Sequence, residues 1–132
     1  MIGWSRTLLA VTGVVFVGIG AGFLLVPTSW AAWVEVALPT PVARIDLRAT
    51  YGGFDLAFGA FLLLCALRAK GWLRPGLWAS ALALAGFAAG RIIGMVVEGA
   101  VPAKMAGLLA VEVALAVLSA VALSRIGPDP QP

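Results

Sequence analysis

Three ionisable residues lie inside long apolar stretches of the chain: Asp55, Arg91 and Glu112. A charge within an apolar membrane helix is costly, so such residues usually face the interior of a helix bundle and pair with one another. Counting about 20 residues back from the basic end of each stretch places all three at a similar depth, roughly 7 to 12 Å below the outer membrane boundary. They are the first candidates for a functional site.

Helical spacing adds further polar residues to this group. Steps of three and four residues connect Arg48 with Asp55 on one stretch, and Arg91 with Glu98 on the next. If these faces converge, an outer rung pairs Arg48 with Glu98, and a deeper rung places Arg91 between two carboxylates. The candidate ligand-binding or charge cluster comprises Arg48, Tyr51, Asp55, Arg91, Glu98 and Glu112.

Two interpretations of this cluster stay open. The ion pairs could only lock the helices together and fix their register. Alternatively, they could line an outward-facing polar pocket for a ligand headgroup or a proton. The Tyr51-Gly52-Gly53 element is equally ambiguous, because its glycines permit either the approach of another helix or room for a ligand.

The composition indicates a membrane protein. Of 132 residues, 62% are apolar and 11% are charged, and the mean hydropathy is +1.06, which excludes an ordinary soluble domain. Basic residues are scattered singly at segment ends, so no nucleic-acid surface is expected. Histidine is absent and Cys65 is the one cysteine, so we expect no metal and no cofactor.

The predicted fold is all-α, a four-helix transmembrane bundle in a single domain over residues 1–132. The expected helices cover residues 5–26, 41–68, 77–99 and 103–125. Thr40 and Pro41 would cap the second of these. Trp30 and Trp33 predict a short interfacial helix over 28–38, between helices one and two, and 127–132 is expected to be a disordered tail.

Two glycine patterns predict close helix packing. The first helix carries four glycines that permit close backbone approach, Gly13, Gly18, Gly20 and Gly22, and Gly18 and Gly22 have the small-xxx-small spacing. The third helix carries a similar stripe of Gly86, Gly90 and Gly94. Both stripes are expected to contact a neighbouring helix.

Basic residues predict the topology. Five lie on one side of the expected spans and three on the other; the five are Arg6, Arg68, Lys70, Arg74 and Arg125. By the positive-inside rule, both termini are cytoplasmic in a multi-pass protein of the cell membrane.

The sequence resembles a known family through Arg-Ala-Thr-Tyr-Gly-Gly at 48–53, Gly-Arg-Ile-Ile-Gly at 90–94, Glu-Gly at 98–99 and the later Glu112. It is similar to the small bacterial four-helix integral membrane proteins of the domain of unknown function 4345 type. The resemblance implies a membrane bundle with this charged signature, in the bacterial inner membrane. It implies no substrate and no reaction.

Three functions are compatible with the charged cluster. The first is a binding or accessory protein that holds a lipid-like or small polar ligand, or docks a partner helix. The second is a small proton-coupled oligomeric transporter using Glu112 or Asp55. The third is a membrane enzyme on a hydrophobic substrate, which is disfavoured because nothing supplies a nucleophile with its base. Expected partners are membrane lipids and, for oligomeric forms, a second copy or a larger membrane complex.

Overall fold

The computed structural model describes residues 2–68 and 70–126, and within these ranges the chain is all-α. Four helical segments there are long and apolar enough to cross a membrane. They are α1 (Ile2–Leu25), the continuous run of α3 (Pro41–Leu47), η1 (Arg48–Phe54) and α4 (Asp55–Leu67), then α5 (Leu73–Glu98) and α6 (Ala103–Arg125). The predicted all-α class and the four spans are confirmed, whereas the predicted tail lies outside the described residues.

The chain divides into two compact units. One, here called the α1–α4 unit, is Ala10–Leu64. The other, the α5–α6 unit, consists of Met1–Leu9 and Cys65–Pro132. Each unit has its own way of holding helices together.

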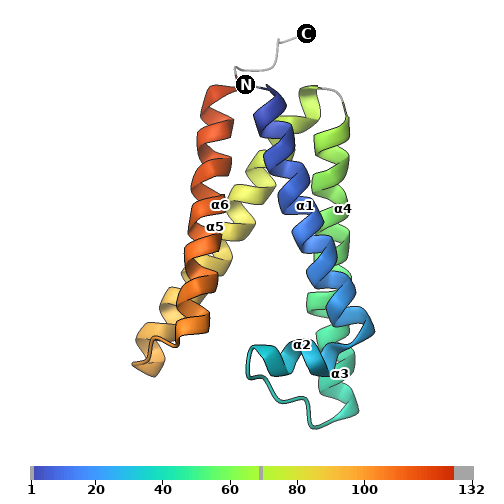
Figure 1. Cartoon of the computed structure of the whole chain (residues 1–132), viewed down its shortest axis with the longest axis vertical. Helices are drawn as coiled ribbons and strands as arrows, with labels where there is room; N and C mark the ends of the chain where they lie inside the picture. Colours follow the sequence, from blue (N-terminus) through green and yellow to red (C-terminus); the bar gives the residue numbers. More distant parts are fainter. Residues whose placement is uncertain (1, 69, 127–132) are drawn as a thin grey trace. The chain divides into compact units, whose positions relative to one another are not determined.

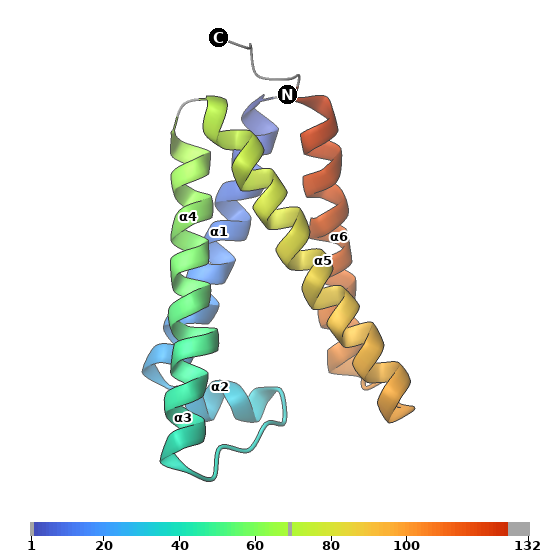
Figure 2. The same cartoon turned by 180° about the vertical axis from the view of Figure 1, so that it is seen from behind.

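Glycines bring α1 close to its partner helix in the α1–α4 unit (Figures 1 and 2). A Cβ on Gly13 would lie 2.9 Å from the carbonyl oxygen of Gly59, and one on Gly20 would lie 2.8 Å from that of Gly52. Only residues without a side chain permit this approach. The predicted close packing is confirmed for Gly13 and Gly20, and Gly22 packs against the Trp30 ring of α2. It is wrong for Gly18, because a Cβ there would meet no described atom within 4 Å.

In the α5–α6 unit, α5 packs along α6 (Figure 1). The hydroxyls of Ser80 and Ser119 are fully buried between them and lie 3.0 Å apart in a hydrogen bond. The predicted glycine stripe of α5 does not contribute here: a Cβ on each of its members would have no described atom within 4 Å, namely on Gly86, Gly90 and Gly94. A polar contact, rather than close backbone approach, marks this helix pair.

The interfacial helix is shorter than predicted. α2 covers Pro27–Trp33, and Val36 and Glu35 then donate their backbone N–H groups to the carbonyls of Ala31 and Ala32. This is a Schellman ending, in which Glu35 takes the left-handed conformation (φ 64°) usually reserved for glycine. The helix therefore ends before the predicted boundary at residue 38.

The third long helix starts four residues earlier than the predicted Leu77. The short 3-10 helix η2 (Lys70–Trp72) leads directly into α5 at Leu73. Pro75 does not interrupt the helix, because it occupies the first turn of α5, where backbone N–H groups have no intrahelical acceptor. The predicted cap is confirmed, since Thr40 Oγ1 accepts a 3.1 Å hydrogen bond from the Ala43 N–H.

Candidate functional site

An ion pair joins α5 and α6 within their apolar spans. Arg91 Nε donates to Glu112 Oε1 at 2.8 Å and to Oε2 at 2.9 Å. One face of α6 positions the carboxylate. Met105, Leu108 and Glu112 follow one another on it at steps of three and four; Met105 and Leu108 are half-buried, and Glu112 is buried. The structure thus brings together two of the six predicted site residues.

The guanidinium of Arg91 keeps part of its hydrogen-bonding capacity. Its Nη1 group donates to Met105 Sδ at 3.2 Å, a weak acceptor. Its Nη2 group makes none of the hydrogen bonds found among the described residues. The Arg91 side chain is 25% exposed and that of Glu112 is 11% exposed. The pair is therefore charge-balanced, and the partly exposed Arg91 side chain has N–H donors that Glu112 does not use.

Arg48 has a backbone partner. Its Nε donates at 2.9 Å to the carbonyl oxygen of Leu24, in the last turn of α1. The last carbonyls of a helix lack intrahelical donors, and a basic side chain commonly satisfies them. Arg48 and Glu98 belong to different units, so their predicted rung stays a prediction.

The Arg-Ala-Thr-Tyr-Gly-Gly element forms a π-helix, the seven-residue segment η1. Segments of this kind are rare and frequently occur at functional sites. The wider π turn also changes which residues share a face, because the α-helical spacing used for the prediction does not hold there. Tyr51 is exposed and packs on Phe23, with ring centroids 5.3 Å apart, whereas Gly52 is buried.

Asp55 follows the π-helix directly and is 4% exposed. It makes none of the ion pairs found among the described residues. Asp55 belongs to the α1–α4 unit and Arg91 to the α5–α6 unit, so the predicted deeper rung of three charges also stays a prediction. Glu98 is exposed at the last position of α5, before Gly99 in the left-handed conformation (φ 64°).

Helical spacing predicted that Ser119 shares a face of the last helix with Glu112, but sequence reasoning missed its partner Ser80, with which it makes the buried hydrogen bond between α5 and α6. A signal was present for Ser80. It lies on the same face as Arg91, through Leu84 and Ala88, and all three of these residues are buried. A serine within a membrane helix commonly bonds across a helix interface.

No curated protein and no solved structure matches the chain. One family model does match, over residues 4–123, and its description is "Domain of unknown function (DUF4345)". This range includes the π-helix, the Arg91–Glu112 ion pair and, apart from residues 2–3 and 124–125, all four candidate spans. The chain therefore belongs to the DUF4345 family.

Proposed function

We propose that this protein is an integral membrane binding or accessory protein, whose polar site within the membrane holds the oxygen-bearing headgroup of a lipid-like or small polar ligand. The observation that supports this most is the Arg91–Glu112 pair in the apolar spans, in which only the Nε group of the guanidinium donates to the carboxylate. Glu112 balances the charge of Arg91, which lowers the cost of holding it in a medium of low dielectric.

The remaining N–H groups of Arg91 are suited to carboxylate, phosphate or hydroxyl oxygens. Guanidinium is a planar donor that is always charged, and it binds such oxygens in a fixed geometry. Because water and other acceptors are scarce within the bilayer, an unused donor there favours a ligand that brings its own acceptors. An apolar chain on that ligand would lie against the surrounding apolar helices.

The other four predicted residues stay candidates for ligand binding or for the charge cluster. Arg48, Tyr51 and Asp55 lie on or beside the π-helix, and Glu98 ends α5. We propose that the site opens to the outer half of the membrane, with both termini cytoplasmic in a bacterial inner membrane. Membrane lipids, and possible assembly with a second copy or a larger complex, complete the proposed partners.

Native mass spectrometry of the full chain, extracted in mild detergent, tests the proposal. The unaltered protein is expected to retain a lipid or a small polar molecule, and Arg91→Gln is expected to lose it. Lys104→Gln is the control, since it removes a cation from the start of the neighbouring helix α6.

Circular dichroism first establishes that both variants are folded. An empty site in the unaltered protein from every preparation would favour a purely structural ion pair. Retention by Arg91→Gln at the parental level would exclude Arg91 as the binding group. Substrate movement in proteoliposomes that depends on pH and is lost in Glu112→Gln would instead support the proton-coupled transporter.

A further inference from the structure

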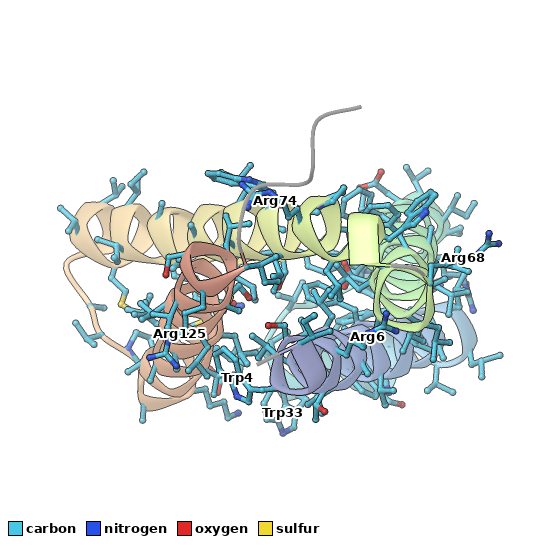
Figure 3. All side chains as sticks on the ribbon, turned by 90° about the horizontal axis from the view of Figure 1, so that it is seen from above. Trp4, Arg6, Trp33, Arg68, Arg74 and Arg125 are labelled. Atoms are coloured by element: carbon cyan, nitrogen blue, oxygen red, sulfur yellow. The ribbon has the colours of Figure 1, made fainter. Side chains whose placement is uncertain are left out.

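The α5–α6 unit carries most of its basic residues at one end, and none of these belongs to the Arg91–Glu112 ion pair. The first turns of α1, the last turn of α6 and the start of α5 lie at one end of this unit, onto which Figure 3 looks. Residues 2–9 and 65–126 include two acidic residues, and neither lies at this end: Glu112 is within the span of α6, and Glu98 is at the far end of α5. Asp129 lies outside the described residues. The basic residues there are Arg6, Arg68, Lys70, Arg74 and Arg125.

The remaining helix ends have no such excess. The connection from α5 to α6 has one acidic and one basic residue, Glu98 and Lys104. In the α1–α4 unit, Glu35 and Asp46 balance Arg44 and Arg48. The net positive charge of the chain is therefore concentrated at one end of the α5–α6 unit. This end, which carries Arg6, Arg68, Lys70, Arg74 and Arg125, is called the basic end.

Two arginines of the basic end bind the carboxyl ends of neighbouring helices. Arg6 Nη1 donates to the Ala66 carbonyl oxygen at 2.9 Å, near the end of α4. Arg74 Nη1 donates to the Ile126 carbonyl oxygen at 3.0 Å, at the end of α6. Helix carboxyl ends carry partial negative charge that would repel an anion. These two bonds offset that repulsion, so the basic end presents positive charge outward.

Arg68 and Arg125 supply exposed cations, and both are labelled in Figure 3. Trp4, Trp72 and Trp78 are exposed in the same terminal turns. Tryptophan is enriched at the headgroup level of a bilayer. Exposed arginines among such tryptophans therefore lie where phospholipid headgroups lie.

We infer that the basic end of the α5–α6 unit binds the phosphate-bearing headgroups of anionic phospholipids. This site is separate from the in-membrane ion pair, because Arg74 and Arg91 are 17 positions apart on α5, which corresponds to roughly 26 Å at about 1.5 Å per residue. Clusters of four to eight basic residues next to membrane helices are typical of anionic-lipid binding. Each such cation contributes about a fivefold gain in affinity.

Native mass spectrometry with equal amounts of phosphatidylglycerol and phosphatidylcholine tests this inference on the full chain. The unaltered protein is expected to retain phosphatidylglycerol preferentially, and added salt is expected to weaken that preference. The double variant Arg68→Gln, Arg125→Gln is expected to lower affinity for phosphatidylglycerol about 25-fold. Neither side chain makes any of the hydrogen bonds or ion pairs found among the described residues, and circular dichroism verifies the folded state.

Two comparison variants make the result specific. Arg44→Gln with Lys104→Gln removes the same charge from other helix ends and is expected to leave the preference unchanged. Arg68→Lys with Arg125→Lys keeps the charge and is expected to keep the preference. Equal retention of both lipids by the unaltered protein, or an equal loss in the Arg44 and Lys104 variant, would overturn the inference. Arg91→Gln is expected to leave it intact, which separates this site from the proposed function.

Discussion

The two units hold their helices together by different means. In the α1–α4 unit, Gly13 and Gly20 bring backbones so close that a single Cβ would collide with Gly59 or Gly52. In the α5–α6 unit, Gly76 packs against Cys65 and Leu9, but a Cβ on Gly86, Gly90 or Gly94 would meet no described atom within 4 Å. The α5 and α6 helices share the Ser80–Ser119 hydrogen bond and the Arg91–Glu112 ion pair instead. One pair relies on shape and the other on polar contacts.

This difference matters because lipid removes the usual reason for helices to associate. Lipid tails are as apolar as leucine, so association depends on close packing and on polar groups that lack other partners. Close packing of backbones provides no free hydrogen-bond donor or acceptor for a ligand. A polar contact can leave donors free, as at Arg91, and the candidate site accordingly lies in the polar helix pair.

The largest expected effect is on the ion pair. Arg91→Ala leaves the Glu112 carboxylate without its partner in an apolar setting, and should lower the free energy of unfolding by about 3 kcal/mol. Unfolding in mixed micelles, followed by circular dichroism, measures this. The double variant Arg91→Met, Glu112→Met removes both charges and should stay near the parental stability. A stable Arg91→Ala single variant would mean that the pair does not hold α5 and α6 together.

A smaller loss is expected from the glycine contact. Gly20→Ala places a Cβ against the backbone of Gly52 and Leu56, and should cost about 2 kcal/mol through overpacking. Gly18→Ala is a matched control on the same helix, with no described atom within 4 Å of the new Cβ. If both variants unfold at the same denaturant concentration, shape does not distinguish the α1–α4 unit.

The buried serines should contribute less again. Ser80→Ala leaves the hydroxyl of Ser119 without its partner and should lower the free energy of unfolding by about 1 kcal/mol. Combined with Ser119→Ala in a double-mutant cycle, the coupling energy should be about 0.6 kcal/mol. Additive effects of the two substitutions would contradict a hydrogen bond between them.

The smallest expected effect has the opposite sign. Gly86→Ala adds a Cβ that meets no described atom within 4 Å, so the higher helix propensity of alanine should stabilise the protein by about 0.5 kcal/mol. A marked loss of stability would show that this part of α5 packs against a neighbour, and would make the two units more alike.

Much of the fold follows from local patterns in the sequence. Long apolar stretches specify the four spans, and Thr40 with Pro41 specifies the start of α3. Helix ends were less predictable: α2 ends at Trp33 and is closed by Glu35 in a conformation that the residue type does not favour, and α5 includes Pro75. Both boundaries depend on backbone hydrogen bonds that cannot be predicted from the type of any single residue.

The candidate site was predictable where the helix stayed regular. Spacing on α5 and α6 placed Arg91 and Glu112 on faces that meet. The spacing argument failed between Arg48 and Asp55, because the π-helix puts more residues into each turn. The glycines of α1 were predicted as a group, and spacing alone did not separate Gly13 and Gly20, which contact the neighbouring helix, from Gly18, which does not.

The π-helix has a consequence for the length of the chain between α3 and α4. Each residue of an α-helix advances the chain by about 100° around the axis. Deleting one residue from η1 would allow regular α geometry, but would rotate everything before it relative to α4. Arg48 would then turn away from the Leu24 carbonyl that it now binds. Insertions and deletions in this stretch should accordingly be less well tolerated than substitutions of its exposed side chains.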